Sequence, residues 1–137
     1  MPKRRKTLLT NLELEVMRSI WDAGGEPQTA RDVAARMNAG RPRPLAYNTI
    51  QTMLTILRDK GVVASVAGPS RAHLYRARVT REEVSTSMVG DLVEKLFDGK
   101  VQPLLVHLVG DDRLSRNELE RLRQLIDSQL TDEGPPR

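Results

Sequence analysis

The sequence LAYNTIQTMLTILRDKG, residues 45–61, decides the fold, because its apolar and polar residues separate at the spacing of an α-helix. With residues placed about 100° apart, one sector holds the side chains expected to face a core: Ala46, Ile50, Met53, Leu54 and Leu57. The opposite sector holds uncharged polar side chains, with Tyr and Arg on one flank: Asn48, Gln51, Thr52 and Thr55, then Tyr47 and Arg58. Asn and Thr are weaker helix formers than Glu, Lys or Ala. A face built from them therefore indicates a binding role.

The major groove of DNA is one surface that such a face fits. The groove admits a single α-helix, and its base edges present hydrogen-bond donors, acceptors and thymine methyl groups. Asn and Gln can pair bidentately with adenine, and Thr offers both a hydroxyl and a methyl group. The first acidic residue of the segment is Asp59, far from its polar start. We therefore interpret the helix, about residues 46–60, as a recognition helix, with an ordinary solvated face as the alternative.

The residues before this helix predict two shorter helices. Thr10 followed by Glu13 is a capping box, and Leu9 and Leu14 flank it as a hydrophobic staple. A second helix is expected from about Thr29 to residue 38, where the Thr29 side chain caps against Asp32.

The residues after the recognition helix predict a β-hairpin. Lys60 and Gly61 supply a cation and a left-handed cap that end the helix. Two β-rich segments, 62–66 and 72–79, flank the loop AGPSR. Three helices followed by a two-stranded hairpin form the plan of a winged helix-turn-helix domain.

The last third of the chain is predicted to be helical. Thr80 with Glu83 and Ser115 with Glu118 form capping boxes, and residues 98–100 interrupt the first of these helices. The fold class is therefore mainly α with a small β-hairpin. We expect a basic flexible tail (1–8), a winged-helix DNA-binding domain (9–79), a helical dimerisation region (80–131) and a flexible tail (132–137).

A homodimer is expected from two arguments. A single winged helix reads too few base pairs to select one site, so two half-sites about one helical turn apart are needed. The helices after residue 80 also carry more apolar surface than a small winged helix can cover. The predicted dimer interface consists of Met88, Val89, Leu92, Val93, Leu96, Leu104, Leu105, Leu108, Leu119, Leu122 and Ile126.

The charge distribution supports contact with nucleic acid through the front half of the chain. Residues 1–80 contain 14 Lys and Arg against 6 Asp and Glu, whereas residues 81–137 contain 8 against 12. DNA-backbone contacts are predicted from the recognition helix, the loop before it and the hairpin tip: Arg41, Arg43, Tyr47, Thr55, Arg58 and Arg71. The basic segment 3–6 is expected to add to them.

Other function classes have little support in the sequence. No catalytic, cofactor or metal site is predicted, because the chain has no Cys and its two His lack partners at motif spacing. Asp111 and Asp112 follow His107 but are interpreted as a loop. The absence of a long apolar run or a signal peptide predicts a cytoplasmic protein. A winged helix that binds protein rather than DNA remains the alternative.

Several stretches together resemble the penicillinase-repressor family of bacterial transcriptional repressors, which includes copper-responsive members. They are LTNLELEVMRSIW, QTARDV, LAYNTIQTMLTILRDKG, HLYRARVTREE and LSRNELERLRQLI, in the order of the family. The resemblance implies an N-terminal winged helix, C-terminal helices that hold a homodimer, and repression of neighbouring genes by covering a promoter operator. It also implies base contacts from Asn48, Thr49, Gln51 and Thr52.

Two departures from the family bear on induction. In antibiotic-responsive members the resemblance implies cleavage at an Asn-Phe bond, but His107 and Leu108 stand at that place here. Copper-responsive members carry paired cysteines near the C-terminus, and this chain has none. An inducing ligand or a protease is left open as a further partner.

Overall fold

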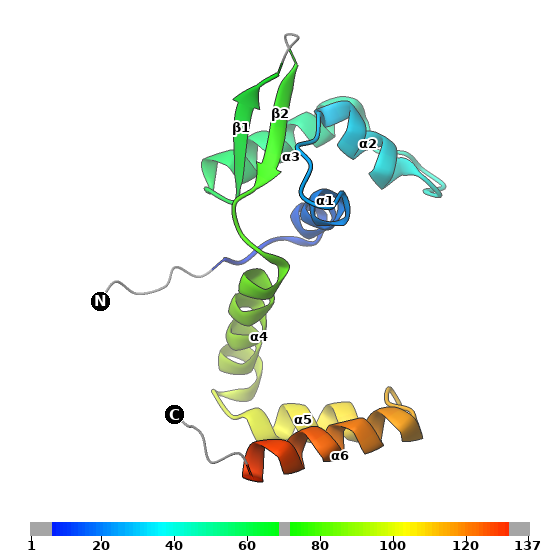
Figure 1. Cartoon of the computed structure of the whole chain (residues 1–137), viewed down its shortest axis with the longest axis vertical. Coiled ribbons are helices and arrows are strands. Elements are labelled where there is room, and N and C mark those ends of the chain that lie inside the picture. The colour runs from blue at the N-terminus through cyan, green and yellow to red at the C-terminus, as the bar shows by residue number, and fades with distance from the viewer. Residues whose placement is uncertain (1–6, 69–71, 132–137) are drawn as a thin grey trace, which may run out of the picture. The chain divides into compact units, whose positions relative to one another are not determined.

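The computed structural model describes residues 7–68 and 72–131, which form helices and one antiparallel hairpin (Figure 1). In chain order the elements are α1 (Asn11–Asp22), α2 (Ala30–Asn38), α3 (Tyr47–Asp59), β1 (Val63–Ala67), β2 (His73–Ala77), α4 (Arg81–Phe97), α5 (Val101–Gly110) and α6 (Arg116–Thr131). The chain divides into two compact units, Met1–Val89 and Gly90–Arg137. No helix in the described part of the chain combines the length and hydropathy of a membrane span.

The first two helices begin at the predicted capping boxes. The Thr10 side chain accepts the Glu13 N–H at 3.3 Å, and the Glu13 carboxylate accepts the Thr10 N–H at 3.0 Å. Thr29 and Asp32 make the same reciprocal pair at 3.1 and 3.0 Å. These local signals therefore predicted both helix starts correctly.

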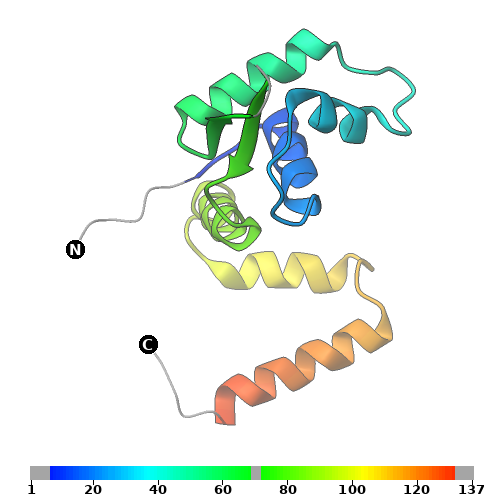
Figure 2. The same ribbon diagram turned by 45° about the horizontal axis from the view of Figure 1, so that its top comes forward.

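The core of the first unit lies where α1, α2 and α3 contact one another (Figure 2). Val16 and Met17 of α1 and Ile50, Leu54 and Leu57 of α3 are completely buried. The prediction that Ala46 faces this core was wrong. Ala46 is exposed and extended because it is the N-cap of α3, one residue before the first helical turn.

Side-chain hydrogen bonds fix the loop that leads into α3. The Asn38 side chain donates to the Leu45 carbonyl at 3.1 Å and accepts the Leu45 N–H at 2.8 Å. Gly61, with φ of 80°, ends α3 in the left-handed region, as its sequence position predicted.

The hairpin pairs β1 with β2 in antiparallel register, with Ser65 opposite Tyr75. A single bridge extends this sheet, because Gln28 and Tyr75 exchange backbone N–H to carbonyl hydrogen bonds of 2.9 and 2.7 Å. The Trp21 indole N–H also donates to the Val79 carbonyl at 3.0 Å. β2 is thus tied to the segment before α2, and the residues that follow β2 are tied to α1.

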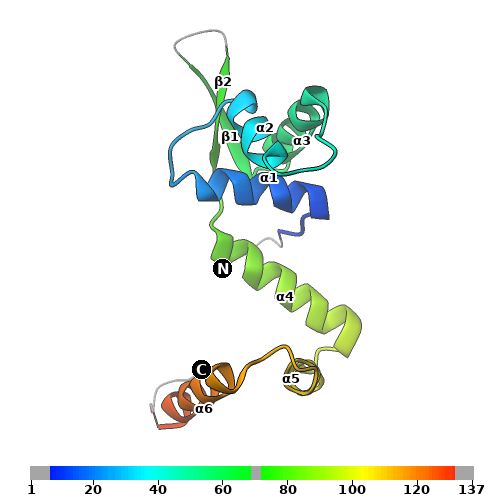
Figure 3. The same cartoon turned by 90° about the vertical axis from the view of Figure 1, so that its right-hand side faces the viewer.

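The second unit contains the C-terminal part of α4, followed by α5 and α6 (Figure 3). Gly99, with φ of 80°, lies in the predicted interruption between α4 and α5. The predicted Ser115–Glu118 capping box is present, with hydrogen bonds of 2.8 and 3.1 Å. No residue of α5 or α6 is buried within the chain.

Candidate nucleic-acid interface

The exposed face of α3 is the predicted polar face. Asn48, Gln51 and Thr52 are exposed, while Ile50 and Leu54 on the opposite side are fully buried. Thr49 is only half-buried and lies between the two faces. The side chains with the capacity to read base edges are therefore free of the protein's own core.

A shallow hollow of about 430 Å³ runs along this face beside the hairpin. It is lined by the exposed polar residues of α3 together with Ile56 and Tyr75. The Thr55 hydroxyl donates to the Gln51 carbonyl at 3.1 Å, so this hydroxyl is engaged within its own helix. Sequence reasoning missed Tyr75 because its place beside α3 depends on the register of β2.

The first turn of α3 carries a small cluster around Tyr47. The Gln51 amide nitrogen donates to the Tyr47 hydroxyl at 3.4 Å, and the Tyr47 side chain is 42% exposed. The Arg31 guanidinium carbon lies 5.7 Å from the centre of the Tyr47 ring, within cation–π range. Arg31 belongs to the first turn of α2 and was not predicted. No local signal in the sequence pointed to it, because its place over the Tyr47 ring depends on how α2 packs against α3.

Three of the cations predicted to contact the DNA backbone belong to the loop before α3 and to α3 itself. Arg41 Nη1 is 3.0 Å from Glu15 Oε1, Arg58 Nη2 is 3.6 Å from Asp59 Oδ1, and Arg43 is exposed. Exposed ion pairs of this kind are worth at most about 1 kcal/mol, so phosphate can compete for both cations. Arg71 and the basic segment 3–6 lie outside the described residues.

One ion pair joins the C-terminal end of α3 to α1. Lys60 Nζ lies 2.7 Å from Glu13 Oε1, and the Glu13 side chain is only 5% exposed. Burial by itself would raise the pKa of the Glu13 carboxyl. Hydrogen bonds from Lys60 and Thr10, together with the Lys60 charge, outweigh burial and lower that pKa below its usual value.

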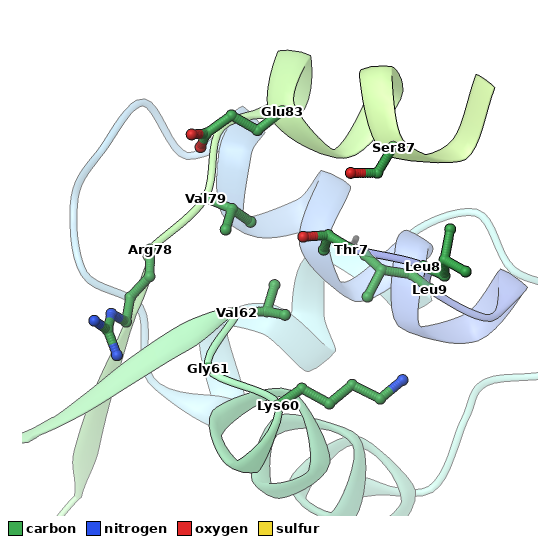
Figure 4. Close-up of a pocket in the computed structure, with 10 residues that line it drawn as sticks. All are labelled: Thr7, Leu8, Leu9, Lys60, Gly61, Val62, Arg78, Val79, Glu83 and Ser87. Carbon is green, nitrogen blue, oxygen red and sulfur yellow. The ribbon is translucent and has the colours of Figure 1, made fainter. Parts of the chain in front are cut away.

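A second hollow of about 580 Å³ lies at this end of α3 (Figure 4). Residues 7–9 and 60–62 line it, together with Arg78 and Val79 after β2 and with Glu83 and Ser87 of α4. None of the residues predicted to contact DNA lines this hollow. It is therefore separate from the polar face of α3.

The predicted dimer residues fall into two classes. Met88 packs against the core of the first unit, and Val93 is buried. The others are half-buried or exposed on α4, α5 and α6: Val89, Leu92, Leu96, Leu104, Leu105, Leu108, Leu119, Leu122 and Ile126. The exposed members include Leu96 at 66% and Leu105 at 52%.

The described residues contain no group of three or more side chains arranged to hold a metal ion. Asp111 Oδ2 instead accepts a 2.7 Å hydrogen bond from Arg113 Nε, which lowers the pKa of Asp111.

Comparison with known proteins identifies relatives of this chain. The family model described as penicillinase repressor matches residues 9–128. The penicillinase repressor of Staphylococcus aureus is 20% identical over 114 residues, which are 83% of this chain and 86% of that protein.

Two solved structures are similar to the fold. The hsRosR-S4 complex is 15% identical, with a TM-score of 0.50 and coverage of 92% of this chain and 93% of that chain. The monomeric form of Bacillus licheniformis BlaI, solved with the blaP half-operator, is 24% identical, with a TM-score of 0.45. The similarity covers 58% of this chain and 90% of the BlaI chain. The expected fold class, mainly α with a winged-helix hairpin, is confirmed.

Proposed function

The chain belongs to the penicillinase repressor family of DNA-binding transcriptional repressors, and we propose that it represses transcription as a homodimer on a palindromic operator. In this proposal α3 enters the major groove, and Asn48, Thr49, Gln51 and Thr52 lie next to the bases. A protein that acts on bacterial promoters works in the cytoplasm, and double-stranded DNA is its principal partner.

The observation that carries the proposal is the composition of the exposed face of α3. Asn48, Gln51 and Thr52 are uncharged and exposed, and none of them packs in the core. Acidic residues are absent from the first turn of this helix. A phosphate-lined groove therefore meets hydrogen-bonding groups without electrostatic repulsion.

Backbone contacts would surround this reading face. Tyr47 and Arg58 belong to α3 itself, and Arg41 and Arg43 belong to the loop before it. Thr55 would join them by turning its hydroxyl from the Gln51 carbonyl to a phosphate. The cations supply the salt-dependent part of the affinity, and the polar face supplies the sequence preference.

The proposed dimer rests on the apolar surface of the second unit. Leu92 is 42% exposed and Leu96 is 66% exposed on the same helix, and α5 exposes Leu105 and Val106. Several large apolar side chains exposed on neighbouring helices favour an interaction site. A second copy of the chain would cover it and would place two copies of α3 on one operator.

The proposal is tested by binding to promoter duplexes and to random duplexes over a range of salt concentrations. We expect affinity for both to fall as salt rises, and the promoter duplex to keep an advantage. Gln51→Ala should reduce that advantage by about 1–3 kcal/mol while affinity for random DNA stays unchanged. Binding that ignores both salt and sequence would favour the protein-interaction alternative.

A further inference from the structure

Tyr47 is an exposed aromatic residue that is nevertheless held on two sides. Its hydroxyl accepts a hydrogen bond of 3.4 Å from the Gln51 amide nitrogen, one helical turn further along α3. The Arg31 guanidinium from α2 lies over its ring at 5.7 Å. Tyr47 thus connects the Arg31 cation of α2 with a side chain of α3 that is proposed to read a base.

We propose that Tyr47 is a positioning residue that orients the Gln51 amide to read adenine through both N6 and N7; this inference rests on the proposed function. A Gln amide has two N–H donors and one carbonyl acceptor. Tyr47 engages one of the two N–H groups. The remaining N–H and the carbonyl oxygen form the pair that adenine N7 and the adenine N6 amino group require.

The orientation matters because a free Gln side chain has several rotatable bonds and presents either amide atom to the groove. When the amide nitrogen is held by the Tyr47 hydroxyl, the amide oxygen and the remaining N–H face the groove in one orientation only. Preorganised groups lose less conformational entropy on binding and discriminate more strongly against the wrong partner. Tyr47 therefore raises specificity through Gln51 without touching the base.

The same hydroxyl also links base reading to the DNA backbone. A tyrosine hydroxyl can accept one hydrogen bond and donate another. While it accepts from Gln51, its own O–H is free to donate to a phosphate oxygen. Arg31, which is exposed and lies over the ring, adds positive charge at the same place.

The test uses the full-length chain and a duplex that the wild-type protein selects from a randomised library. Each adenine of the selected duplex is replaced in turn by 7-deazaadenine, which removes the N7 acceptor and keeps the N6 amino group. The ratio of dissociation constants for the modified and natural duplexes is measured for the wild type, Tyr47→Phe, Gln51→Ala and the double variant. Tyr47→Phe is the matched change, because it keeps the ring beneath Arg31 and removes only the hydroxyl.

We expect one adenine position at which the wild-type ratio is on the order of 10-fold and Gln51→Ala brings it close to one. Tyr47→Phe should lower the ratio at that same position to about two- to threefold, with unchanged thermal unfolding. Adding Tyr47→Phe to Gln51→Ala should leave the ratio unchanged, because the two residues act as one unit.

Two results would overturn the inference. Tyr47→Phe could weaken binding to every duplex equally and keep the full ratio, which would make Tyr47 a backbone contact alone. Alternatively, the position sensitive to N7 could be unaffected by Gln51→Ala. A library from which no sequence is enriched would instead refute the proposed function itself.

Discussion

Replacing Lys60 by Met would remove the charge that joins the recognition helix to α1 while keeping most of the apolar stem. Lys60 Nζ lies 2.7 Å from Glu13 Oε1. The Glu13 side chain is 5% exposed, and the Lys60 side chain is 40% exposed. In the variant the Glu13 carboxylate keeps the Thr10 N–H at 3.0 Å but loses its counter-ion.

The expected loss of unfolding free energy at pH 7 is about 1–2 kcal/mol. Removing one partner of a hydrogen bond and leaving the buried group without it costs about 1–3 kcal/mol. The lower part of that range applies here, because the ammonium of Lys60 is partly exposed and water screens the pair.

The sign of the pH dependence follows from the lowered pKa of Glu13. A carboxyl whose pKa is lower in the folded state stabilises the fold above the pKa of the unfolded chain, about 4.3 for Glu. This stabilisation is lost as the pH falls through the folded-state pKa. The difference between wild type and Lys60→Met should therefore shrink below about pH 4 and vanish once Glu13 is protonated in both proteins.

Urea unfolding at pH 7 and pH 3, at one protein concentration, measures both quantities. Arg123→Met is the control, because both side chains of its 3.8 Å pair with Glu120 are exposed, at 72% and 51%, and the pair spans about one helical turn. The control should cost about 0.5 kcal/mol or less. A Lys60→Met variant that costs no more than this control, or that loses as much stability at pH 3 as at pH 7, would show that the Lys60–Glu13 pair does not stabilise the fold.

Two further predictions concern binding and assembly. Arg31→Ala should weaken binding to all duplexes alike and lower the slope of log affinity against log salt by about one. Titrations at several salt concentrations check this, with Arg36→Ala, at an exposed position of the same helix, as the control. A loss of affinity confined to one DNA sequence would contradict the prediction. Leu92→Glu should convert dimers to monomers, as measured by sedimentation. Leu130→Glu, at a 78% exposed position outside the predicted interface, should leave the dimer intact. Equal behaviour of the two variants would contradict the proposed interface.

Local signals in the sequence predicted the helix starts well. A capping box needs only a side chain and an N–H three residues apart, so Thr10 and Thr29 marked helix starts without knowledge of the fold. Periodicity predicted the buried face of α3 for the same reason. It failed at Ala46, because a helical wheel assumes that the helix has already begun.

Contacts between distant segments were not predictable in this way. The capping box already explains the presence of Glu13 in the sequence. No neighbouring residue indicates that its carboxylate also binds Lys60, 47 residues later. The bridge between Gln28 and Tyr75 likewise depends on where the hairpin packs. Arg31 becomes part of the candidate interface only because α2 brings it over the ring of Tyr47. These contacts require the folded chain.

The start of α3 lacks both a side-chain cap and an acidic residue in the first turn, a combination that it shares with α5 and that fits its proposed role. Capping boxes with Glu or Asp open α1, α2, α4 and α6. α3 begins at Ala46 without a side-chain cap and without an acidic residue in its first turn. A missing cap costs about 1 kcal/mol. In the proposed function, however, a carboxylate at this place would repel the DNA phosphates near the helix.

The fold compensates for this missing cap outside the helix. Asn38 holds both backbone groups of Leu45, the residue before the N-cap, and Lys60 ties the far end of α3 to buried Glu13. A helix anchored at both ends by its neighbours can carry weak helix formers such as Asn48 and Thr52 on its outer face and still remain rigid. Since a base-reading surface requires such rigidity, in the proposed function these anchors contribute to specificity as much as the polar side chains do.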